Sequence, residues 1–270
     1  MTASGAQGAI SEQESATTRD VALVGSAHVV MEGAGVPVRR VLPSRQVPYR
    51  LVDPFLLLDE FKLESFGGES FPPHPHRGFE IVTYMIRGTG QHSDSEGNQG
   101  EVRAGGLQRI TAGRGIWHGE GGGSGAAGPV HGLQLWINLA RAQKQIPPGY
   151  QGVQPEEIPE RPVGDARVRV LVGEGSPTRL HTTATYLDVR LPAGGRTEIT
   201  LPAHFQGFVY VLEGSGAFGH SQQTIEATQI GALAAGGPLV AAAGPEGAWF
   251  VVAAGHPHRE PVTFNGPYVD

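Results

Sequence analysis

Short apolar runs, each ended by a glycine- or proline-rich turn, recur along the chain from Val21 onward. VALVGSAHVVMEG (21–33) has the pattern of a strand pair, and QHSDSEGNQGEVRAGGLQRITAG (91–113) that of a hairpin with a polar tip. Further strands are predicted over FEIVTYMIRG, HGLQLWINL, VRVLVG, ATYLDVRLPAG, GFVYVLEGSGAFG and AWFVVAAG, while DPFLLLDEF is expected to pack across a sheet. The pattern therefore predicts an all-β fold of many short strands, and the 41 glycines and 21 prolines agree with it.

The chain divides into two similar halves. YMIRGTG (84–90) matches YVLEGSG (210–216) at an offset of 126 residues, and Leu107 and Leu233 keep that offset. A shared offset predicts a duplicated β unit. The predicted organisation is a disordered polar tail over 1–20, a first domain over 21–140, a proline-rich linker over 141–163 and a second domain over 164–270.

Charge and cysteine content exclude several classes of function. The formal charge is −6, the 20 Lys and Arg residues are scattered, and only Lys62 and Lys144 are lysines, so no basic stripe supports nucleic-acid binding. The chain has no cysteine, and hence no disulfide or thiolate site. The N-terminus is polar, and no apolar run is long enough to span a membrane. We expect a soluble, cytoplasmic protein.

Two histidine motifs carry the chemistry. In FPPHPHRGFE, His74 and His76 are two residues apart, and in GRGIWHGE the same spacing separates His118 and Glu120. Because alternate residues of a strand point to one side, two neighbouring strands could present all four side chains to one point. Three imidazoles and a carboxylate suit a divalent first-row metal such as Fe, Mn, Ni, Cu or Zn, with positions left open for O₂ or a chelating substrate.

DPFLLLDEF, HPHRGFE, TAGRGIWHGE and HGLQLWINL, in this order, closely resemble the pirin family of the cupin superfamily, and YVLEG and EPVTFNGPYV extend the resemblance to the second half. It implies a bicupin, two β-barrels in one chain, with metal in the first barrel only. The implied ligands are His74, His76, His118 and Glu120, and the metal usually associated with the family is iron. With the offset of 126, the positions in the second half that correspond to the three histidines hold Thr200, Pro202 and Gly244, so the second half is expected to lack the site.

The remaining candidates are weaker. Glu80 is four residues after His76 and could face the same way, but a buried hydrogen-bonding role is favoured over ligation. His92 is expected to be solvated at a hairpin tip. His131 begins a buried strand, where a role beside the cavity is the less favoured alternative to packing. The other histidines lack a partner at ligand spacing, and the HPH pair of His256 and His258 is expected at the surface.

Parity turns Trp117 away from the metal site, and core packing is its expected role. Three apolar side chains are candidates for the wall of the cavity entrance: Phe55, Leu57 and Phe66. Relatives usually continue beyond the GPYV-like segment, whereas this chain stops at Asp270; we expect this difference to leave the ligands untouched.

Two functions follow from the resemblance, and a third reading is a non-catalytic cupin that keeps the ligands. The first is an Fe(II)-dependent dioxygenase of the quercetin 2,3-dioxygenase type, in which O₂ opens a flavonol ring and carbon monoxide leaves. Glu120 is its predicted catalytic base, accepting the substrate's hydroxyl proton, although a tightly bound ligand cannot also be a free base. The alternative is a redox-sensing regulator that binds a protein partner without turnover.

Overall fold

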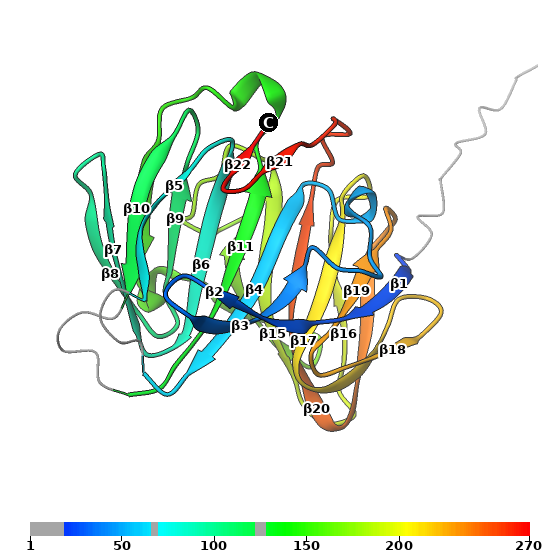
Figure 1. The fold of residues 1–270 in the computed structure, drawn as a ribbon. Coiled ribbons are helices and arrows are strands. Elements are labelled where there is room, and N and C mark those ends of the chain that lie inside the picture. Colours follow the sequence, from blue (N-terminus) through cyan, green and yellow to red (C-terminus); the bar gives the residue numbers. More distant parts are fainter. Residues whose placement is uncertain (1–18, 66–69, 122–127) are drawn as a thin grey trace, which may run out of the picture.

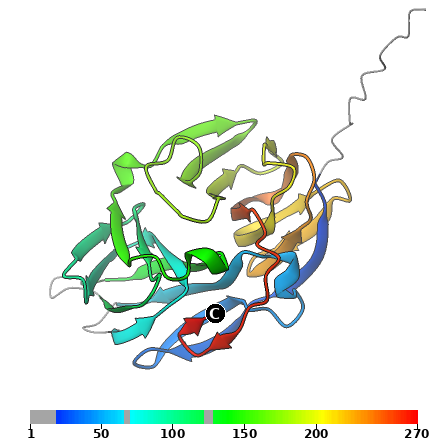
Figure 2. The same ribbon diagram turned by 90° about the horizontal axis from the view of Figure 1, so that it is seen from above.

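The computed structural model describes residues 19–65, 70–121 and 128–270, and its two β-barrels lie side by side (Figures 1 and 2). Phe66 and most of the predicted tail lie outside these ranges. Three short 3₁₀ helices connect strands within them: η1 (Tyr49–Leu51), η2 (Arg141–Gln143) and η3 (Pro155–Glu157). The predicted all-β class is confirmed.

The first barrel has two walls. One is a seven-stranded sheet in the order β12-β9-β6-β11-β4-β3-β2, and the other is a four-stranded sheet in the order β5-β10-β7-β8. The strands of the larger wall are β2 (His28–Glu32), β3 (Val36–Leu42), β4 (Phe55–Leu63), β6 (Phe79–Arg87), β9 (Leu107–Thr111), β11 (Val130–Asn138) and β12 (Gly149–Val153). Those of the smaller wall are β5 (Phe71–His76), β7 (Thr89–Asp94), β8 (Gln99–Arg103) and β10 (Ile116–Gly121).

The second barrel is one nine-stranded sheet in which two long strands take part in both walls. Its strands are β1 (Val21–Ser26), β13 (Glu160–Val163), β14 (Ala166–Val172), β15 (Ala184–Leu191), β16 (Arg196–Ile199), β17 (Gln206–Phe218), β18 (Gln223–Glu226), β19 (Gln229–Leu233) and β20 (Leu239–Gly255). A last hairpin, β21 (Phe264–Asn265) with β22 (Tyr268–Val269), returns to the first barrel, where Tyr268 bridges to Arg77 (Figure 1).

Three local expectations need correction. The two strands predicted over 21–33 form, but they do not pair: β1 pairs with β19 of the second barrel and β2 with β3 of the first. The proline-rich stretch 141–163 is built into the sheets, because β12 pairs with β9 and β13 with β14. Arg19, at the end of the predicted tail, is fully buried, and its guanidinium donates to five backbone carbonyls of the second barrel.

The pairing of the strands supports the duplication. Tyr84 of β6 lies opposite Leu133 of β11 and Leu107 of β9. Tyr210 of β17 lies likewise opposite Val251 of β20 and Ile230 of β19. The offset of 126 therefore holds at the tyrosines, but the counterpart of Leu107 is Ile230, 123 residues later, rather than Leu233.

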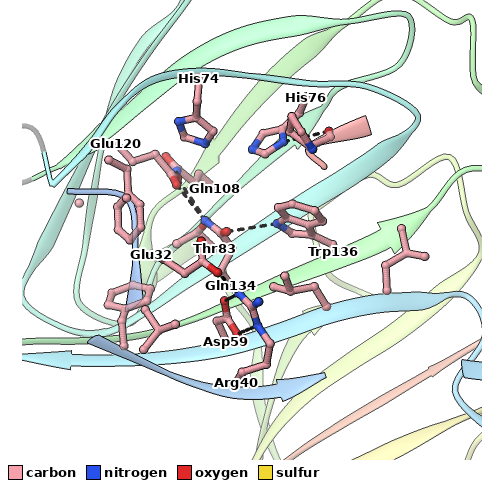
Figure 3. A pocket seen from close by; sticks show the side chains of 18 of the residues that line it. Glu32, Arg40, Asp59, His74, His76, Thr83, Gln108, Glu120, Gln134 and Trp136 are labelled. Atoms are coloured by element: carbon pink, nitrogen blue, oxygen red, sulfur yellow. Dashed lines mark hydrogen bonds and ion pairs between the residues drawn. The ribbon is translucent and has the colours of Figure 1, made fainter. Parts of the chain in front are cut away.

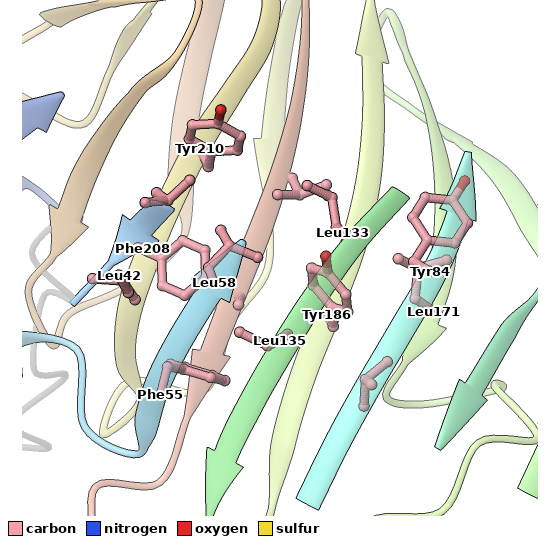
Figure 4. Packing of buried hydrophobic residues seen from close by; sticks show 14 of the residues in the cluster. Leu42, Phe55, Leu58, Tyr84, Leu133, Leu135, Leu171, Tyr186, Phe208 and Tyr210 are labelled. Atoms are coloured by element: carbon pink, nitrogen blue, oxygen red, sulfur yellow. The ribbon is translucent and has the colours of Figure 1, made fainter. Parts of the chain in front are cut away.

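The apolar cores explain why the two barrels differ. The largest cluster lies between the barrels and joins residues such as Leu58 and Leu135 to Phe208 (Figure 4). A second cluster fills the interior of the second barrel; there Ile199 and Ala241 occupy the strand positions that His76 and His118 have in β5 and β10. Among its described residues the first barrel has two smaller clusters, and the space between them is a cavity.

Candidate metal centre

Strand pairing brings the three histidines together. β5 and β10 run antiparallel with His118 opposite His74 and Ile116 opposite His76. The ring centroids of His74 are 4.7 Å from those of His76 and 4.5 Å from those of His118, and His76 and His118 are 5.0 Å apart. Their donor atoms lie within 4.8 Å of one another. The three histidines therefore converge, whereas Glu120 belongs to a second group of donors, with His92 and His118. His74 and His76 are seen above the cavity in Figure 3.

Backbone carbonyls orient two of these rings. Nδ1 of His74 is 2.8 Å from the carbonyl oxygen of Pro72, and Nδ1 of His76 is 3.3 Å from that of Pro267. A carbonyl oxygen only accepts, so each Nδ1 carries the hydrogen and each Nε2 keeps a lone pair. This is the arrangement by which proteins fix a metal-binding histidine.

Burial keeps two of the three imidazoles neutral. It lowers the pKa of His76 to about 3, with a further contribution from His74, and that of His118 to about 2, with further contributions from His76, His74 and His92. Both ring nitrogens of His118 are buried and have no hydrogen-bond partner among the described residues. Neutral imidazoles with unused lone pairs are what a first-row metal ion requires, so His76 and His118 fit such an ion.

Glu120 is held by amide donors. Gln134 Nε2 donates to its Oε2 at 2.8 Å, Gln108 Nε2 donates to its Oε1, and Thr83 Oγ1 lies 3.4 Å from Oε1. Trp136 Nε1 donates to Gln134 Oε1 at 3.1 Å, which turns the amide nitrogen of Gln134 toward the carboxylate (Figure 3). Burial raises the pKa of Glu120 above its usual range.

The sequence reasoning missed these amide-bearing neighbours. A signal was present for Gln134, which is a polar residue in the middle of the largely apolar strand HGLQLWINL; Gln108, in LQRIT, stands beside other polar residues and is less conspicuous. A glutamine facing the inside of a strand of this kind requires a buried polar partner, which here is Glu120.

Glu80 faces away from the histidines, and its hydrogen-bonding role is confirmed. Strand parity does not carry over from His76, because β5 ends there and Gly78, at φ +91°, turns the chain into a different sheet. The Glu80 carboxylate accepts from Thr111 Oγ1 at 2.8 Å and from the backbone N–H of His181 at 2.9 Å, so it ties the first barrel to the 176–182 loop of the second.

The expectation for His92 is wrong. The hairpin tip lies further on, at 95–97, and His92 lies within β7, directly opposite Glu120. Its side chain is fully buried and faces the inside of the barrel. His92 and Asp94 repeat the two-residue spacing of the other motifs, which is the signal that could have identified them.

Of two other histidines, His131 agrees with the favoured expectation and His258 does not. His131 faces the second barrel rather than the cavity, and its Nε2 donates to Glu60 at 2.8 Å. His258 is half-buried and donates to the carbonyl of Asn138 at 2.9 Å, whereas His256 is exposed as expected. Trp117 points away from the histidines, as parity requires, but it is 55% exposed and does not pack in a core.

A cavity of about 670 Å³ opens beside the histidines. Leu57, Trp136 and Phe71 contribute apolar walls, and Phe264 and Pro267 of the C-terminal segment close one side. Of the expected wall residues, Leu57 lines this cavity, whereas Phe55 packs between the barrels. The C-terminal segment thus completes the site of the first barrel.

A charged group forms the far end of the cavity. Arg40 donates to both oxygens of Asp59, at 3.0 and 2.7 Å, and to Glu32 at 2.6 Å (Figure 3). All three side chains line the cavity. The cavity therefore has polar ends and apolar walls, which suits a flat ring system with polar substituents.

Two barrels of this topology, with one hollow and histidine-lined, define a bicupin. The family models agree: residues 35–137 match the model described as Pirin, and residues 186–270 match the one described as Pirin C-terminal cupin domain. The chain belongs to the pirin family.

Relatives and solved structures are similar over most of the chain. A pirin-like protein of Arabidopsis thaliana is 42% identical over 96% of this chain and 87% of its own. A Pseudomonas aeruginosa protein named "Putative quercetin 2,3-dioxygenase" is 38% identical over 93% and 91%.

Among solved structures, the quercetin 2,3-dioxygenase of Acinetobacter baumannii has a TM-score of 0.84 at 28% identity, covering 94% of this chain and 92% of its own. The Escherichia coli pirin YhhW, solved in complex with nickel(II), has a TM-score of 0.66 at 18% identity and covers 87% and 98%. No helix in the described ranges is long and apolar enough to cross a membrane.

Proposed function

We propose that this chain is a metal-dependent dioxygenase that opens the ring of a flavonol or a related small aromatic. The observation that carries the proposal is that three histidines with unused ring nitrogens and a buried carboxylate lie beside a cavity of about 670 Å³. The names of the Pseudomonas and Acinetobacter relatives support the substrate class.

His74, His76, His118 and Glu120 would hold a divalent first-row ion, with Fe(II) as the expected metal. Such an ion, when bound, supplies Lewis acidity and open positions for a hydroxyl-bearing substrate and O₂. The nickel complex of the Escherichia coli pirin makes Ni(II) a second metal to test.

The chain's own residues have distinct tasks. Glu120 accepts the hydroxyl proton of the substrate. Gln134 and Gln108 keep the carboxylate in place. Leu57, Trp136 and Phe71 exclude water and hold the ring.

The test is turnover of quercetin by chain loaded separately with Fe(II), Mn(II), Ni(II), Cu(II) and Zn(II). Loss of quercetin absorbance should be matched by O₂ uptake and by release of one carbon monoxide per quercetin. Glu120→Gln, which keeps the shape of the side chain, should reduce kcat by about 10²-fold or more. Metal-loaded chain that releases no carbon monoxide with any of these metals contradicts the proposal.

A redox-sensing regulator is the second candidate, and Trp117 is the observation in its favour. This indole is exposed on the outer face of β10, directly before His118. A change at His118 would reach the surface through one peptide unit. A regulator of this kind needs no turnover. The affinity of the chain for its protein partner should differ between the Fe(II) and the Fe(III) forms, and in Trp117→Ala the two forms should bind the partner equally.

A further inference from the structure

His92 has a place in the metal centre that the motifs do not assign to it. It lies in β7 opposite Glu120 of β10, so the two side chains share the inner face of the barrel. Its ring stacks on Tyr150, with centroids 4.4 Å apart and planes 6° from parallel, and its centroid is 5.6 Å from that of His118. The ring is therefore held in a single orientation beside the histidine cluster.

Asp94 fixes which nitrogen of His92 carries the hydrogen. Nε2 of His92 is 3.0 Å from Asp94 Oδ2. Asp94 also accepts from the backbone N–H groups of Glu96 and Asn98 and from the amide of Asn98, which favour its ionised form. A carboxylate only accepts, so Nε2 is the donor and Nδ1 keeps a lone pair.

That lone pair has no partner among the described residues, although Nδ1 of His92 is buried. Packing against Tyr150 accounts for the place of the ring but not for a bare nitrogen in the interior. A buried acceptor without a partner destabilises the folded chain. The bare nitrogen thus points to a ligand.

The ligand is indicated by the donors around it. Donor atoms of His92, His118 and Glu120 lie within 4.8 Å of one another, and so do those of His74, His76 and His118. The two triplets share His118, both of whose ring nitrogens are bare. The centre therefore has five donor side chains in two overlapping sets.

We propose that His92 is a fifth metal-binding residue. Together with His118 and Glu120 it forms a second position for the divalent first-row ion, and this position adjoins the three-histidine position. The proposal rests on the metal centre of the proposed function, but not on its reaction. Asp94 is then a positioning residue that sets the tautomer of His92.

The test is Co(II) binding by the full chain stripped of metal, followed by the visible spectrum of Co(II) and by competition with a chelator. His92→Phe keeps a ring to stack on Tyr150 but has no nitrogen. We expect its Co(II) affinity to fall ~10- to 100-fold, and its spectrum to change with the coordination number. X-ray absorption of the Ni(II)-loaded chain should count one imidazole fewer in this variant than in the parent.

Two further variants separate ligation from packing. Asp94→Asn can turn an amide N–H toward His92 and so move the ring hydrogen to Nδ1, and it should weaken Co(II) binding in the same direction. Tyr150→Phe keeps the stacking and removes only a hydroxyl that is buried without a partner, so its affinity and spectrum should equal those of the parent. Near-UV circular dichroism checks the fold, and His92→Gln replaces His92→Phe if the latter does not fold.

An affinity within twofold of the parent and an unchanged spectrum in the His92 variant overturn the proposal. Failure of the parent to bind Co(II) or Ni(II) overturns it together with the metal centre. Normal binding with no quercetin turnover contradicts the proposed reaction alone.

Discussion

Tyr84 and Tyr210 occupy equivalent places in the two barrels, and each donates its hydroxyl hydrogen to a carboxylate of the other barrel. Tyr84 Oη is 2.7 Å from Asp188, and Tyr210 Oη is 2.6 Å from Glu60. Asp188 and Glu60 are equivalent as well. Asp188 is paired with Val251, which is the strand partner of Tyr210, and Glu60 is paired with Leu133, which is the strand partner of Tyr84. The duplication thus extends from the strands to the hydrogen bonds that join the barrels.

The tyrosine bonds should stabilise the contact between the barrels. Tyr210→Phe removes a donor from a buried carboxylate, and we expect the free energy of unfolding in urea to fall by about 1.5–3 kcal/mol. Tyr186→Phe is the matched control, because its hydroxyl is buried in the same layer and has no partner in the part of the chain that the structure describes. That variant should be neutral or more stable; equal losses in the two variants would show that the bond to Glu60 contributes nothing.

Glu60 should make stability depend on acid pH. Burial alone would raise the pKa of this carboxyl, but hydrogen bonds from His131, Tyr210 and Arg39 outweigh it and lower the pKa from 4.5 to about 2. A lowered folded-state pKa contributes stability above pH ~4.5, and this contribution is lost as the pH falls toward 2. The stability lost by Glu60→Gln, measured by urea unfolding, should therefore shrink by up to about 3 kcal/mol between pH 7 and the acid end of that window. A difference that does not vary with pH would contradict this assignment.

The sequence was sufficient for the strands and for the convergence of His74, His76 and His118, because strand parity and pairing are local rules. It was insufficient where a contact depends on the second barrel or on the C-terminal segment. The carbonyl of Pro267 that orients His76, and the tyrosine that holds Glu60, come from distant parts of the chain. His92 was misplaced for a local reason: the polar residues around it look like a turn, although the turn begins only after Asp94.

The C-terminal hairpin should be sensitive to the smallest change at Gly78. A Cβ at Gly78 would lie 1.9 Å from the carbonyl oxygen of Val269, and the φ of Gly78 is +91°. Gly78→Ala should displace the hairpin and so weaken Co(II) binding, because Pro267 would no longer orient His76. The loss in the free energy of unfolding should exceed the cost of the backbone strain alone. Gly97 has a φ of +85° and open space around it, so Gly97→Ala should cost only about 1–2 kcal/mol and leave Co(II) binding unchanged. Identical behaviour of the two variants would mean that the hairpin does not support the site.

Gln134 should tune Glu120. Gln134→Leu removes a hydrogen bond to the carboxylate, so the pKa of Glu120 should rise further and less of it should be ionised at neutral pH. We expect turnover at pH 7 to fall about tenfold and to recover as the pH is raised, which a pH–rate profile would record. Gln151→Leu, in β12 and bonded to Pro177 and Arg179 instead, is the control and should keep the parent profile. A loss in Gln134→Leu that is the same at every pH would assign Gln134 a purely structural role.

The central claim is that the convergent histidines of the first barrel hold a metal ion. It is tested most directly by metal analysis of the chain after anaerobic loading with Fe(II), beside His76→Ala, His118→Ala and the control His220→Ala, whose side chain is exposed. The account predicts one iron per chain in the parent and the control, and loss of iron in the two site variants. A parent that retains no iron, or site variants that retain as much as the parent, would contradict it.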